Sequence, residues 1–110
     1  MLISGWIDSF SGQQRMVEDL TKRIAARCEP VVWARIHTVA PTMDPAQSRG
    51  YIRARAALVV DREVQIATHS LHGVSDSFIE RVARSVSETL VRKMMTAIAR
   101  QHPSELRRAA

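Results

Sequence analysis

The chain lacks most features that would assign a compartment or a membrane role directly. It has one cysteine, Cys28, among 110 residues, so no disulfide can form within a molecule and nothing points to an oxidising compartment. No apolar run approaches the roughly 20 residues needed to cross a bilayer. The opening "MLISGWIDSF" has no basic residue and contains Asp8, unlike a secretory signal. We therefore expect a cytoplasmic location and no membrane partner.

Motifs of catalysis and metal binding are also scarce. The sequence contains no glycine-rich phosphate loop and no Gly-x-Ser-x-Gly nucleophile elbow. His69 and His72 lie close together, but no carboxylate or second cysteine completes a metal-ligand pattern with them and Cys28. We expect no enzymatic activity, no metal and no cofactor.

Positive charge is what the chain has in excess. Sixteen Lys and Arg against eleven Asp and Glu give a formal net charge of +5, which is typical of proteins that bind polyanions. Fourteen of these cations are arginines, whose planar guanidinium suits bidentate phosphate contacts. A GC-rich coding bias would give the same count, so both explanations stay open.

The first half of the chain predicts two strands and a helix. Residues 2–7 form a short segment with apolar residues on both faces, which predicts a first strand. Ser11 and Gln14 form a capping-box pattern that begins a helix, and Pro30 ends it. From residue 31 to 38 the pattern alternates with a period of two, which predicts a second strand. The apolar side of the helix consists of Met16, Val17, Leu20, Ile24 and Cys28.

The second half predicts a hairpin and a long helix. After a loop with two prolines at 41–48, residues 51–60 alternate as a third strand, and a turn at 61–62 leads to a fourth strand at 64–68. Ser77 and Glu80 form a second capping box, beginning a helix that continues to about Arg100.

The resulting order, β-α-β-β-β-α, predicts an α+β fold: a four-stranded sheet with two helices packed on one face. Residues 1–101 would form the domain, and residues 102–110 a short, basic, frayed tail. The aliphatic set of each strand would meet the helices. The opposite, uncovered face would carry Trp33, Arg35, His37, Tyr51, Arg53 and Arg55.

Such a face combines aromatic and guanidinium groups, which can stack on unpaired bases and neutralise phosphates. Two alternatives stay open: an ordinary solvated sheet face, or a homodimer interface with Trp33 and Tyr51 as its anchors. A second basic set lies on the predicted outer sides of the helices, where it extends the RNA-binding surface or forms ordinary ion pairs. This set consists of Arg15, Lys22, Arg81, Arg84 and Arg92.

Three stretches resemble the ribosome hibernation-promoting factor family, also called ribosome-associated inhibitors. "MLISG" resembles the first strand of that family, "VVDREVQIATHS" its closing hairpin, and "DSFIERVARSVSETLVRK" its long last helix. The resemblance covers Met1 to about Arg100 and implies the same β-α-β-β-β-α order.

The resemblance implies a partner, the rRNA of the small ribosomal subunit. A member would occupy the channel used by messenger and transfer RNA and silence translation under stress, without chemistry. We therefore predict a non-enzymatic ribosome-associated inhibitor. The competing prediction is a dimerising protein-interaction module with no nucleic-acid role. Salt dependence separates the two, because phosphate contacts weaken steeply with ionic strength.

Overall fold

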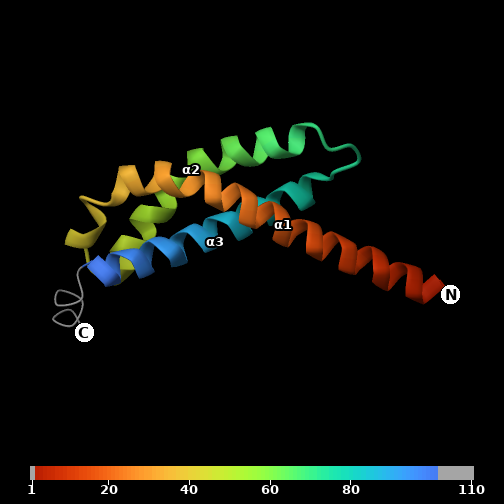
Figure 1. Ribbon diagram of the computed structural model, residues 1–110, viewed down its shortest axis with the longest axis horizontal. Helices are drawn as coiled ribbons and strands as arrows, with labels where there is room; N and C mark the ends of the chain where they lie inside the picture. The colour runs from red at the N-terminus through yellow and green to blue at the C-terminus, as the bar shows by residue number, and fades with distance from the viewer. Residues whose placement is uncertain (1, 102–110) are drawn as a thin grey trace.

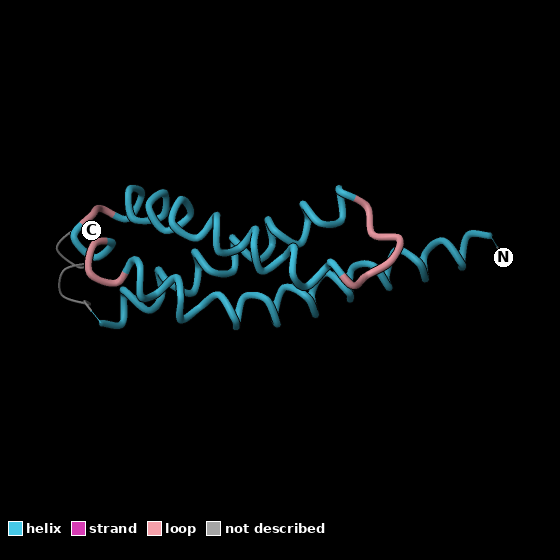
Figure 2. Tube along the Cα trace, turned by 90° about the horizontal axis from the view of Figure 1, so that it is seen from above, coloured by secondary structure: helices cyan, strands magenta, loops and turns pink. Residues whose placement is uncertain are grey.

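Three long α-helices make up an elongated bundle (Figure 1). The computed structural model describes the backbone of residues 2–101 and the side chains of residues 12–101. Its elements are α1 (Leu2–Ile36), the 3-10 turn η1 (Ala40–Thr42), α2 (Pro45–His69) and α3 (Asp76–Gln101). Each helix packs on both of the others, and the bundle is 58 Å long. α1 is the longest helix, and its N-terminal turns run past the connection between α2 and α3 (Figure 2).

The predicted α+β fold with a four-stranded sheet is wrong, because residues 2–101 contain helices and no strand. The segments predicted as the first two strands, 2–7 and 31–38, lie in α1 or directly after it. The predicted hairpin, 51–68, is continuous helix within α2. The tail predicted at 102–110 lies outside the described residues.

A spacing of four explains the error, because residues four apart share one face of a strand and also one face of a helix. In α2, Ile52, Ala56 and Val60 are buried, which is compatible with a strand and with a helix. The residues midway between them distinguish a strand from a helix. A strand would bury Ala54 and Leu58 as well, yet both side chains are exposed, that of Leu58 by 77%. The buried stripe of α2 is therefore helical.

Pro30 does not end the first helix, and Ser11 does not begin it, since both lie inside α1. A proline in a helix interior removes one hydrogen bond and costs about 3 kcal/mol. Cys28, Val32 and Ile36 surround it in sequence and have no exposed surface. Burial of an aliphatic side chain is worth about 1.5–3 kcal/mol, so packing on both sides of the proline outweighs the lost bond.

Side-chain caps fix where the later helices begin. Asp44 precedes α2, and its carboxylate accepts a hydrogen bond from the backbone N–H of Gln47 at 2.9 Å. Ser75 precedes α3, and its hydroxyl accepts from the N–H of Phe78 at 3.2 Å. The predicted long last helix is confirmed, although Ser75 caps it rather than Ser77.

One core runs along the bundle axis and joins all three helices. Its residues recur at intervals of three and four, so each helix presents one continuous apolar stripe. The largest fully buried side chains are Ile24, Val32, Ile36, Ile52, Val64, Val82, Val86 and Leu90.

Candidate interaction surfaces

Of the six residues predicted to share a sheet face, five lie on two helices and one directly follows a helix. Trp33 and Arg35 belong to α1, His37 directly follows it, and Tyr51, Arg53 and Arg55 belong to α2. The ring of His37 stacks on that of Trp33 with 5.8 Å between centroids, and its Nδ1 lies 3.0 Å from the Trp33 carbonyl oxygen. These contacts fix the His37 ring against the last turn of α1.

Arg53 and Arg55 show most clearly how a helix separates residues that a strand would place on one face. Two residues apart, they would point the same way on a strand, but on a helix they are separated by about 200°. The Arg55 guanidinium lies over the ring of Tyr51, 5.3 Å from its centroid, a cation–π contact within α2. Arg53 is exposed on another side of the helix. The two arginines therefore belong to different surfaces.

Trp33 and Tyr51 are half-buried and pack against the core. The predicted homodimer interface anchored by these two aromatic rings therefore loses its exposed anchors. Among the described side chains, the large apolar ones that are exposed are not aromatic. They are Met16, Val31, Val39, Leu58 and Ile66.

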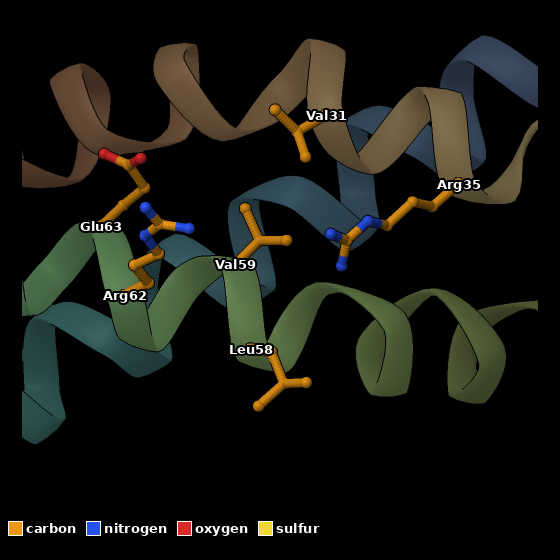
Figure 3. Close-up of a pocket in the computed structure, with 6 residues that line it drawn as sticks. All are labelled: Val31, Arg35, Leu58, Val59, Arg62 and Glu63. Atoms are coloured by element: carbon orange, nitrogen blue, oxygen red, sulfur yellow. The ribbon is translucent and has the colours of Figure 1, made fainter.

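Two of these exposed side chains line a groove between α1 and α2, called here the arginine groove (Figure 3). It has a volume of about 240 Å³. Val31 and Val59 point into the space between the two helices, whereas Leu58 points away from α1 at the rim (Figure 3). The lining residues are Val31, Arg35, Leu58, Val59, Arg62 and Glu63.

Positive charge surrounds the apolar floor of this groove. Arg35 extends from α1 toward α2, and Arg62 extends from α2 toward α1 (Figure 3). Within residues 12–101 neither makes an ion pair. Glu63 is the one acidic lining residue, and it pairs with Arg27 at 3.7 Å. Arg55 lies about two turns before Arg62 on the same side of α2, which adds to the positive field.

A second cleft lies between α1 and α3, called here the polar cleft. Its volume is about 440 Å³, and three cations and three hydroxyl side chains line it with one carboxylate. One of the cations, Lys93, pairs with Glu29 at 3.5 Å. The lining residues are Glu18, Thr21, Lys22, Ser85, Thr89, Arg92 and Lys93.

The polar cleft brings together part of the second predicted basic set. Lys22 and Arg92 both line it, although they are far apart in sequence. Arg81 donates a hydrogen bond to the side-chain oxygen of Gln14 at 3.1 Å, which also joins α3 to α1. Arg15 and Arg84 are exposed and do not line the cleft.

Cys28, His69 and His72 were the residues considered for a metal site. Cys28 is fully buried, and burial together with the negative charge of Glu63 raises the pKa of its thiol to about 11. That thiol stays protonated and unreactive at neutral pH. His69 and His72 belong to no group of three or more metal-ligating side chains within the described part of the chain.

The exposed aliphatic residues at the arginine groove were missed at the sequence level. The strand pattern assigned Leu58 to the buried set, and Arg62 to a hairpin turn. The available signal was the run of three aliphatic residues from Leu58 to Val60, because three successive residues span about 200° of a helix and cannot all lie on one buried stripe.

Comparison of the chain with models of protein families, with curated proteins and with solved structures finds no match. Across residues 2–101, no helix has both the length and the apolar character required to span a membrane. Function is therefore inferred from the surface of the bundle.

Proposed function

We propose that this chain is a non-enzymatic interaction module that docks a protein partner on its α1–α2 face. The observation that carries the proposal is Leu58, which is 77% exposed at the rim of the arginine groove. Val31, on the facing helix, is 42% exposed and lines the same groove. Exposed apolar side chains that line a groove with a polar rim are typical of binding surfaces.

The bundle does not need these side chains for its own core. Each helix already has a complete buried stripe, and the α2 stripe follows Ile52, Ala56, Val60 and Val64. A helix added over the α1–α2 groove would turn three helices into four, and helix-in-groove binding uses aliphatic anchors of this kind. A cytoplasmic location, predicted from the single cysteine and from the lack of a secretory signal and of a long apolar run, stays part of the proposal.

The test uses a synthetic amphipathic helical peptide with leucine anchors and an uncharged polar face. We expect it to shift the backbone amide resonances of Val31, Leu58 and Val59 in an NMR titration of the full chain. Burying a leucine contributes about 1.5–3 kcal/mol, so Leu58→Gln should weaken binding by about tenfold or more. Ala57→Gln is the matched control, because it changes an exposed neighbour on another side of α2. Equal affinity of both variants, or shifts confined to other surfaces, would refute this docking site.

The polar cleft favours a second candidate function, the binding of a polyanion such as RNA. Lys22 and Arg92 line the cleft with Lys93, which pairs with Glu29, and with the hydroxyls of Ser85 and Thr89, a combination suited to phosphate oxygens. The predicted inhibition of the small ribosomal subunit is a proposal of this second kind. The sheet face that supported this proposal does not exist among the described residues, and only these cationic side chains favour it.

Sedimentation with purified small ribosomal subunits tests this second candidate. Phosphate contacts predict co-sedimentation at low salt that is lost at high salt, and the variant Lys22→Glu/Arg92→Glu should weaken it at every salt concentration. Arg53→Glu/Arg55→Glu is the control, because neither residue lines the polar cleft. Absence of the natural chain from the subunit fraction at low salt would exclude the ribosomal function.

A further inference from the structure

We propose that the occupant of the arginine groove is an acidic amphipathic helix of a partner protein, an inference that rests on the proposed function. Its aliphatic anchor would lie on Val31 and Val59, and its carboxylates would bind Arg35 and Arg62. Three properties of the groove lead to this occupant: its length, its charge and the kind of apolar side chain that it offers.

The length of the groove matches a short helix. The lining of the groove on α2 runs from Leu58 to Glu63, five residues apart, which corresponds to about 7.5 Å along the helix. On the facing helix, Val31 and Arg35 are one turn apart. A partner helix of about two to three turns therefore spans this lining, and a volume of about 240 Å³ receives its side chains rather than its backbone.

The charge of the groove selects carboxylates. Arg35 and Arg62 come from opposite walls (Figure 3), and no described carboxylate pairs with either of them. The one acidic lining residue, Glu63, is held by Arg27 at 3.7 Å. A guanidinium group binds a carboxylate through two parallel hydrogen bonds, so acidic side chains on both flanks of a partner helix would each meet an arginine.

The same features disfavour two other occupants. A second copy of this chain, docked by the same face, would bring arginines against arginines, and like charges across an interface are unfavourable. Single-stranded nucleic acid uses aromatic side chains as stacking platforms. The apolar lining of this groove is instead aliphatic, namely Val31, Leu58 and Val59.

The test compares three synthetic helical peptides of about fourteen residues that share leucine anchors and differ in their flanking residues: glutamate, glutamine or lysine. Each is titrated into the full chain, with affinity measured by fluorescence anisotropy and the site by NMR. We expect the glutamate peptide to bind about tenfold or more tightly than the glutamine peptide at low salt, with shifts at Val31, Arg35, Leu58 and Arg62.

Charge reversal supplies the decisive control. Arg35→Glu/Arg62→Glu should lose the glutamate peptide and gain the lysine peptide, while circular dichroism checks that it stays folded. If that variant does not fold, Arg35→Gln/Arg62→Gln replaces it and should abolish the preference for glutamate. Arg53→Glu should change nothing, because this residue lies outside the groove.

The outcomes separate the two proposals. Equal affinity for the glutamate and glutamine peptides at the groove would overturn the acidic partner and leave the docking function intact. No binding of any peptide at the groove would overturn both. Displacement of a bound glutamate peptide from the groove by a single-stranded RNA oligonucleotide, at a lower concentration than unlabelled peptide requires, would also overturn the acidic helix as occupant.

Discussion

Replacing Gly50 with alanine should stabilise the protein, because this glycine lies inside α2. Glycine in a helix interior costs about 1 kcal/mol relative to alanine. A Cβ atom built on Gly50 meets nothing within 4 Å, so no clash or packing contact alters that figure. We therefore expect about 1 kcal/mol of added stability, or a rise in melting temperature of about 4 °C for a domain of this size.

The same substitution at Gly73 should act in the opposite direction. Gly73 lies in the connection between α2 and α3 with φ of +74°, a left-handed conformation that alanine adopts only at a cost. A Cβ there also meets nothing within 4 Å, so the backbone term acts alone. That term is about 1–2 kcal/mol, of which the reduced entropy of the unfolded chain returns part. We expect a net loss of about 1 kcal/mol.

Urea unfolding followed by circular dichroism at the helix band measures both variants against the natural chain. The two substitutions are chemically identical and leave the charge unchanged, so each is the control for the other. A Gly50→Ala variant that is no more stable than the natural chain would show that residue 50 is not in a helix interior. That result would refute the helical structure of α2 and, with it, the arginine groove.

Three further predictions test the core, a cap and the buried thiol. Leu90→Ala removes a side chain with no exposed surface and should cost about 3 kcal/mol in urea unfolding; a loss below 1 kcal/mol would contradict its central position. Asp44→Ala removes the acceptor for the Gln47 N–H and should cost about 1 kcal/mol, whereas Asp44→Asn should cost much less. Burial and the charge of Glu63 raise the pKa of Cys28 from 9.0 to about 11, so the unfolded chain loses the thiol proton first. Stability should therefore fall as the pH rises from 9 to 11, and Cys28→Ala should remove that part of the fall.

The last helix could be predicted from sequence because its pattern has one interpretation. Phe78, Val82, Val86 and Leu90 are four apart, and the residues midway between them are mostly charged or polar. No strand would bury such a face, since a strand also brings every second residue to the same side.

α2 was misassigned because its midway residues are apolar. Ala54 and Leu58 completed an alternating pattern that a strand explains as well as a helix does. Intrinsic propensity carried the missing information: residues 53–58, "RARAAL", are all strong helix formers, and none is β-branched. Weighing that composition against the alternation would have favoured the helix.

For the candidate site, the sequence predicted which single residues are exposed but not which of them lie together. Arg35 and Arg55 were expected to reach solvent, and they do. Their neighbours depended on the fold: a sheet would place both beside Arg53, whereas in the bundle Arg35 lines one groove with Val31, Val59 and Arg62. Only the packing of α1 on α2 joins these residues into one groove.

The short connections between the helices bear on how the chain reaches its native state. Residues 37–44 and 70–75 are all that separate three successive helices. Each hairpin of helices can therefore form from neighbouring sequence, and topologies rich in local contacts fold within microseconds to milliseconds. Over residues 2–101 there is also no unpaired strand edge to recruit other chains. Rapid collapse without such an edge favours recovery from heat denaturation over aggregation.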